Sequence, residues 1–136
     1  MERLRRRLPL ALAALALASS VPAGCGEQDD PEADVRATLD ALAQAVAQKD
    51  FQRLCDRIYA PELVKQIESV LPCEVALQRS TLASAQRPKL EVRSVTVKGN
   101  SATARIRTSA ANEKPSDDTA KLVKQGDDWR VIALAS

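Results

Sequence analysis

Apolar residues recur every three or four positions through the first half of the chain, and every second position after Pro88. The first spacing is typical of an amphipathic helix with one buried face, and the second of a half-buried strand. A first helix is predicted to start after Pro31, with acidic residues in its first turn, and to end near Lys49. Its apolar stripe consists of Val35, Leu39, Leu42 and Val46.

Three further helical segments are predicted before Pro88. Asp50 is placed to cap a second helix, and Pro61 suits the first turn of a third. The break at Leu71-Pro72 separates the third helix from a fourth segment that runs from about Cys73 to Ala83. The predicted buried residues are Phe51, Leu54, Cys55 and Ile58 in the second helix, Leu63, Val64 and Ile67 in the third, and Leu77 in the fourth.

The second half predicts an antiparallel meander. Apolar residues alternate with polar ones at the even positions Leu90 and Val92, and then at the odd positions Val95 and Val97. This change of phase predicts a β-bulge at Arg93-Ser94. A Gly99-Asn100 turn leads into a strand, and a polar loop is expected over 111–116. The remaining expected parts are a strand over 119–124, a turn over 126–128 and a strand over 129–134. The predicted fold class is α+β, with N-terminal helices packed on a curved antiparallel sheet.

The N-terminus reads as an export signal. Four arginines precede an apolar run from Leu8 to Ala18, and small residues follow up to Cys25. This order is typical of a secretory signal peptide. Ala23-Gly24-Cys25 resembles the end of a bacterial lipoprotein signal, although Pro22 stands where that family usually has Leu. The resemblance implies cleavage before Cys25 and lipidation of its thiol.

Two other interpretations of the leader remain open. Cleavage after Ala23 would secrete a soluble protein, and an uncleaved leader would act as a membrane anchor. The apolar run is shorter than the roughly 20 residues that span a bilayer, which disfavours the anchor. The chain therefore divides into a signal peptide at 1–24, a lipidated cysteine with an acidic tether at 25–34, and a folded domain at 35–136.

Composition excludes several classes of function. Without its leader the chain has 16 basic and 17 acidic side chains, which gives no electrostatic support for binding nucleic acid. Histidine is absent, so no Ser-His-Asp triad, Cys-His pair or imidazole metal site can form. Phe51, Tyr59 and Trp129 are the only aromatic residues. Nucleotide-binding and CxxC motifs are also missing, so we predict neither cofactor nor metal.

The three cysteines predict one disulfide. If Cys25 carries lipid, Cys55 and Cys73 remain to pair, as oxidising compartments permit. A loop of this length should stabilise the fold by about 3 kcal/mol in the chain-entropy model. A redox-active pair is the alternative, but both thiols fall on apolar helix faces.

The sheet half of the chain is the more basic half, with Arg105, Arg107, Lys121 and Lys124 on its expected outer face. Such a surface could contact anionic lipid headgroups near the anchor. The simpler interpretation, which we favour, is a solvated sheet face.

Several segments together resemble the NTF2-like superfamily, and within it small actinobacterial lipoproteins. They are Gln48-Lys49-Asp50-Phe51, Tyr59-Ala60-Pro61-Glu62-Leu63, Pro72-Cys73-Glu74, the hairpin around Gly99-Asn100, and Gly126-Asp127-Asp128-Trp129-Arg130-Val131. The resemblance covers roughly Asp34 to Leu134. It implies a cone, in which a strongly bent sheet wraps around helices and encloses a pocket. It also makes a homodimer plausible.

Enzymes of this superfamily place an Asp-His or acid-tyrosine arrangement in that pocket, and here the histidine cannot exist. Asp56 and Tyr59, three residues apart, could face the pocket mouth, but Asp56 is expected among the solvated Arg53 and Arg57. Trp129 is expected in the core. No catalytic residue is therefore assigned.

The leading hypothesis is a membrane-tethered, extracytoplasmic binding or accessory module. Its pocket would hold a small apolar ligand, or its sheet would dock an envelope protein, as the related Mce-associated and penicillin-binding-protein accessory domains suggest by analogy. The alternative is a small enzyme of the isomerase or hydrolase kind with a carboxylate base. That alternative needs a buried, unpaired Asp or Glu. A structural spacer, with its cone filled by apolar side chains, is a third possibility.

Overall fold

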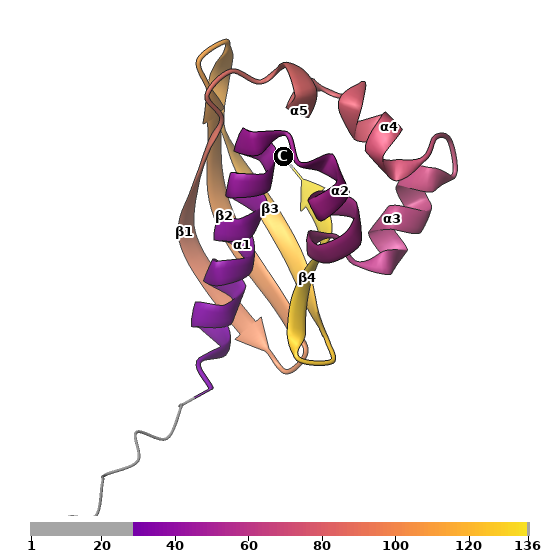
Figure 1. The fold of residues 1–136 in the computed structure, drawn as a ribbon. Coiled ribbons are helices and arrows are strands. Elements are labelled where there is room, and N and C mark those ends of the chain that lie inside the picture. The colour runs from indigo at the N-terminus through magenta and orange to yellow at the C-terminus, as the bar shows by residue number, and fades with distance from the viewer. Residues whose placement is uncertain (1–28, 136) are drawn as a thin grey trace, which may run out of the picture.

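The computed structural model describes residues 29–135. The leader and the predicted lipidation site Cys25 lie outside these residues. Within them the chain forms helices first and a four-stranded sheet second, as Figure 1 shows. None of the helices in the described part is long and apolar enough to cross a membrane.

The long helix α1 (Pro31–Gln48) lies across one face of the sheet (Figure 1). Asp30 caps its start by accepting hydrogen bonds from the backbone of Glu32 and Ala33, so the last residues of the expected tether are already helical. Lys49 ends the helix in the left-handed conformation. The fully buried residues are Val35, Leu39, Leu42 and Ala45. Val46, expected in this stripe, is only half-buried, because it faces a cavity described below.

The next helices are shorter than the sequence pattern predicts. Asp50 caps α2 (Phe51–Arg53), which continues directly as the π-helix η1 (Leu54–Ile58). α3 (Pro61–Glu68) begins at its proline as expected. The single helix expected over 73–83 is wrong: it is divided into α4 (Cys73–Gln78) and α5 (Thr81–Ser84). Ser80 causes the division, because its side chain accepts a hydrogen bond from the Leu82 backbone and so starts a new helix.

The sheet is an antiparallel meander in the order β1-β2-β3-β4. Its strands are β1 (Lys89–Lys98), β2 (Ser101–Ala110), β3 (Glu113–Gln125) and β4 (Asp128–Ala135). The register of β1 against β2 shifts between Val92 and Ser94, which confirms the predicted bulge. Gly99 and Gly126 occupy the two hairpin turns with φ of 58° and 61°, where a side chain would be strained.

The polar loop expected over 111–116 is wrong. β3 already begins at Glu113. In its register with β2, Ser116 pairs with Thr108, Asp117 with Arg107 and Asp118 with Ile106. The alternation that marks a strand is absent here because the inward face of this segment borders an open cavity. Polar side chains therefore occur on both faces of the strand.

Small residues occupy the middle of the inward face of the sheet, where side chains of α1 share the core. Ala104 of β2 and Ala120 of β3 are directly opposed and are both fully buried. Because neither side chain projects far, the larger Leu39 and Leu42 of α1 have room in the same core cluster. Trp129, at the start of β4, is 4% exposed, which agrees with its expected place in the core.

The edge strand β4 has a partner outside the meander. Tyr59 forms an isolated parallel bridge with Val131, and the Ala60 backbone N–H donates to the Val131 carbonyl at 2.8 Å. Arg130 donates from Nη1 to the Asp56 carbonyl oxygen at 3.0 Å. The segment after η1 is thereby held against the outer side of β4.

Candidate functional site

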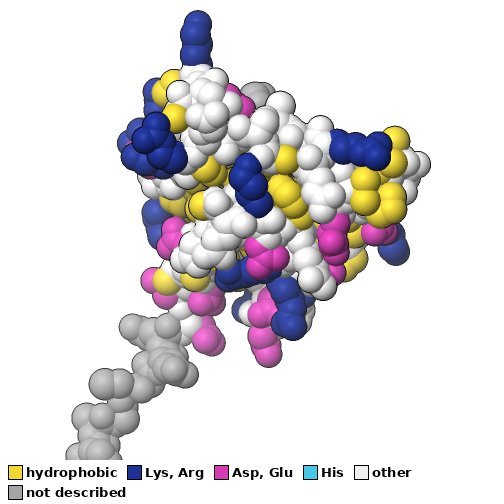
Figure 2. Space-filling model, turned by 45° about the horizontal axis from the view of Figure 1, so that its top comes forward, with side chains coloured by type: hydrophobic (Ala, Val, Ile, Leu, Met, Phe, Trp, Pro, Cys, Tyr) yellow, Lys and Arg dark blue, Asp and Glu magenta, His cyan; other side chains and the backbone are white. Residues whose placement is uncertain are grey.

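A cavity of about 510 Å³ opens at one end of the fold, between the helices and the sheet. The second half of α1, the region from α4 to α5, and one end of every strand line it. Figure 2, in which the top of Figure 1 comes forward, shows apolar side chains between the charged groups on this end. The cavity is therefore open to solvent at this end of the fold, and we call this opening the mouth.

Seven large apolar side chains contribute to the wall. They are Leu42, Val46, Leu77, Leu82, Leu90, Ile106 and Leu134. Leu134 is 45% exposed although it shares the inward face with its partner Ala120, because it stands in the open cavity. The cavity is thus not filled by the protein's own leucines and valines, as a structural spacer would require.

The main polar feature of the wall is Asp118 of β3. Its carboxylate accepts from Thr108 Oγ1 at 2.6 Å and from Ser116 Oγ at 2.8 Å. All three residues line the cavity, and all three are partly buried. Asp118 lies opposite Ile106 in the register and has the same phase as Ala120, so its side chain is on the concave face of the sheet. The sequence analysis did not single out this group.

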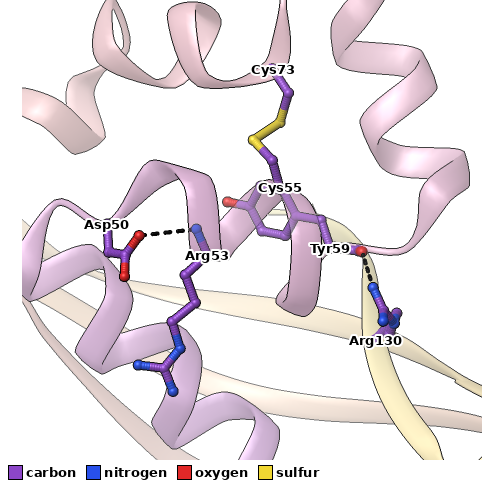
Figure 3. Close-up of a disulfide and its surroundings, with 6 residues drawn as sticks. All are labelled: Asp50, Arg53, Cys55, Tyr59, Cys73 and Arg130. Atoms are coloured by element: carbon purple, nitrogen blue, oxygen red, sulfur yellow. Dashed lines mark hydrogen bonds between the residues drawn. A yellow bond between two sulfur atoms is a disulfide. The ribbon is translucent and has the colours of Figure 1, made fainter.

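Tyr59 contributes a second polar group to the cavity wall. The residue is 3% exposed, and burial raises the pKa of its phenol to about 12. The hydroxyl is therefore protonated at neutral pH. Figure 3 shows the ring extending away from Arg130, toward the interior of the fold, while the backbone carbonyl faces the arginine.

The structure separates Asp56 from Tyr59. Asp56 is exposed, as expected, and so are most other acids. η1 ends at Ile58 and Tyr59 is extended, with ψ of 142°, so the two side chains no longer share a helix face. Among the carboxylates of residues 29–135 none is fully buried, and Asp118 already accepts two hydroxyl hydrogen bonds. The buried, unpaired carboxylate that a base-catalysed reaction needs is thus not found in this part of the chain.

Cys55 and Cys73 form a disulfide, with their Cα atoms 6.1 Å apart (Figure 3). The bond connects η1 to the first residue of α4. α4 then supplies Leu77 to the cavity wall, and the following segment supplies Ser80 to Leu82. The disulfide therefore fixes the outer wall of the cavity to the core of the domain.

Charged side chains of both signs stand at the mouth. Lys89, Glu113 and Lys114 belong to the cavity lining. Lys49 donates from Nζ to the Ala83 carbonyl, which joins the end of α1 to α5. Asn112 also joins the β2–β3 turn to the segment after α5, because its side chain accepts from the Gln86 N–H at 2.9 Å and donates to the Ser84 carbonyl at 3.2 Å.

The outer face of the sheet carries Arg105, Arg107 and Lys121, as the sequence predicts. The same prediction is wrong for Lys124, which pairs with Trp129 and has the phase of the buried Ala120 and Leu122, so it belongs to the inward face. Arg107 pairs with Asp117 at 3.0 Å, and Arg105 and Lys121 are exposed. Within residues 29–135 no cluster of His, Cys, Asp or Glu is arranged to hold a metal ion.

No family model matches the chain, and no sufficiently similar protein was found among curated sequences. Solved structures do match. An NTF2-like protein of unknown function from Silicibacter pomeroyi superposes with a TM-score of 0.55 at 18% identity, covering 75% of this chain and 90% of that one. A de novo designed NTF2-fold protein superposes with a TM-score of 0.52 at 13% identity, covering 75% and 84%. The fold is NTF2-like.

A third match is a SEC-C motif-containing protein from Rhodopseudomonas palustris, with a TM-score of 0.58 at 17% identity, covering 77% of this chain and 80% of that one. At such identities the likeness establishes the NTF2-like architecture alone. The cone and pocket expected from the sequence resemblance are thus present, and the chemistry of the pocket has to be argued from its own residues.

Proposed function

We propose that this protein is an extracytoplasmic lipoprotein, anchored through Cys25, whose NTF2-like domain binds a small and largely apolar ligand without transforming it. The observation that carries the proposal is the open cavity of about 510 Å³ with its apolar wall. Ligand sites in proteins are commonly 300–1,000 Å³, mostly apolar, with a few placed polar groups.

The polar groups of the cavity support binding better than catalysis. The Asp118 carboxylate is held by the Thr108 and Ser116 hydroxyls, which orient it toward a fixed position. The Tyr59 phenol has a raised pKa and so acts as a neutral hydrogen-bonding group. Groups of this kind fix the orientation of a ligand.

The export signal and the disulfide support the location. A disulfide between Cys55 and Cys73 suits a protein that folds in an oxidising compartment. With these two cysteines paired, Cys25 remains for the lipid that its sequence context suggests.

Filling the cavity tests the ligand proposal. The exported Cys25→Ser chain, purified without detergent, should bind the neutral probe N-phenyl-1-naphthylamine saturably at one site. Ala43 lines the cavity on α1, so Ala43→Phe should weaken this binding about tenfold, which corresponds to about 1.4 kcal/mol. The measurement is a fluorescence titration.

Ala47 provides the matched control, because it is exposed on the same helix and does not line the cavity. Ala47→Phe should leave the probe affinity unchanged, and both variants should give the circular dichroism spectrum of the parent. Equal affinities in all three proteins, or no saturable binding by the parent, would contradict the proposal.

A further inference from the structure

The mouth of the cavity and the start of the domain lie at opposite ends of the fold. Figure 1 shows α1 running from the end that carries the β1–β2 and β3–β4 hairpins to the end that carries α5. Thr38, in the first half of α1, donates to the Trp129 carbonyl at the start of β4. The α1 residues that line the cavity are Leu42, Ala43 and Val46, all in its second half.

The helix is longer than the chain that would connect it to the lipid. α1 has 18 residues, which corresponds to about 27 Å at 1.5 Å per residue. Six Cα–Cα steps lead from Cys25 to Pro31, and these span at most about 22 Å when fully extended. If the mouth faced the lipid surface, Pro31 at the other end of α1 would stand about the length of this helix above that surface. The connecting chain is too short for that.

Negative charge at the end of the domain near the proposed anchor also favours a mouth that faces away from the membrane. Six exposed carboxylates gather there, and Figure 2 shows acidic side chains around the place where the grey trace begins. They are Asp29, Asp30, Glu32 and Asp34 at the start of α1, and Asp127 and Asp128 in the β3–β4 hairpin. Anionic headgroups repel such a group, so the domain stands off the bilayer instead of lying flat on it.

We infer that the anchored protein holds its cavity mouth away from the membrane that carries its lipid, and therefore takes its ligand from the aqueous side rather than from its own bilayer. This inference rests on the anchoring part of the proposed function. It assigns the ligand a source: a molecule that is dissolved, or carried to the mouth, in the surrounding compartment. The short connection and the acidic end of the domain both oppose direct extraction from the anchoring membrane.

The orientation is measured by energy transfer from a single dye to acceptor lipids in the vesicle that holds the protein. Asn100→Cys places the dye in the hairpin at the anchored end, and Ala111→Cys places it in the β2–β3 turn beside the mouth. Both residues are exposed, Cys55 and Cys73 are paired, and the proposed lipid would occupy Cys25. Because about 27 Å separates the two ends, transfer should be about twofold more efficient from position 100.

A lengthened connection provides the control. Inserting 20 Gly and Ser residues after Gly26 adds ample length, so the difference between the two positions should largely disappear. Equal transfer in the natural chain would overturn the inference, and so would a difference that persists after lengthening. Failure of the anchor itself is seen separately, as protein that stays in the supernatant when the vesicles are pelleted.

Discussion

Tyr59 combines three roles in one residue. Its ring is buried and lines the cavity, its backbone bridges to Val131 of β4, and its carbonyl accepts a long hydrogen bond of 3.5 Å from Arg130. It also ends the π-helix η1. Tyr59 therefore connects the wall of the cavity to the edge of the sheet, and ionisation of its phenol should lower the stability of the fold.

The pH dependence of stability should reveal this coupling. Burial raises the pKa of Tyr59 from 10.0 to about 12, so the folded state holds the proton more tightly than the unfolded state. The resulting stability is fully present below pH 10 and is lost as the pH rises toward 12. The loss should be about 2–3 kcal/mol, measured by urea unfolding.

Tyr59→Phe is the control, because phenylalanine cannot ionise and should lack this part of the alkaline loss. Tyr59 is the only tyrosine, so the phenolate absorbance reports it alone. A transition near the ordinary pKa of tyrosine in the folded protein would contradict the prediction.

At the scale of elements, the cavity wall depends on segments with little secondary structure of their own. α4 has six residues and α5 has four, which is too short for an isolated helix to be stable. The Cys55–Cys73 disulfide and the Lys49 contact with Ala83 attach them to the rest of the domain. Without these attachments the wall lacks support on its outer side.

Replacing both cysteines, as Cys55→Ala with Cys73→Ala, should lower the free energy of unfolding by about 3 kcal/mol. The reason is that the bond closes a loop with a sequence separation of 18, which restricts the unfolded chain. Hydrogen exchange should rise most in α4 and α5. Unchanged stability, or exchange that rises equally throughout the domain, would argue against this role for the bond.

Particular elements show how far the sequence predicts the fold. The bulge at Arg93-Ser94 and both Gly turns were predictable, because each leaves a local signature in phase or residue type. The cone itself was expected from a resemblance to a family. The start of β3 was not predictable from alternation, since a strand that borders a cavity is polar on both faces.

The same cause hid the polar group of the site. Asp118 is two residues before Ala120 and four before Leu122, so it is in phase with the buried face of β3. That phase was the available signal, and it was lost because the strand was expected to begin only at residue 119. For Asp56 the sequence suggested a site that the structure does not form. Asp56 is near Tyr59 in sequence, but the π-helix ends at Ile58 and Tyr59 is extended, so the two side chains point apart.

On the scale of the whole molecule, the proposed anchor at one end and the mouth at the other would form a single arrangement. The lipid proposal predicts that the wild-type protein stays with the membrane fraction and is released by detergent. Cys25→Ser should shift it to the soluble extracytoplasmic fraction, because the acyl chains supply the binding energy. Intact mass of the wild-type protein should show the added diacylglycerol.

Wild-type protein that is soluble and begins after Ala23 would support ordinary secretion and contradict the anchor. Retention of the Cys25→Ser variant on the membrane would instead point to an uncleaved leader. The three interpretations of the N-terminus are thus separated by one fractionation and one mass measurement.

The bridge between Tyr59 and Val131 has a consequence for molecules crowded side by side. An uncovered edge strand offers free N–H and C=O groups to any neighbouring chain, which is a common start of aggregation. Here Ala60 already occupies the Val131 carbonyl, and on the opposite edge strand β1 Glu91 and Arg93 form an ion pair of 2.9 Å in solvent. Neighbouring copies therefore meet an occupied carbonyl on one flank and a charged pair on the other, and both features disfavour pairing of sheets edge to edge.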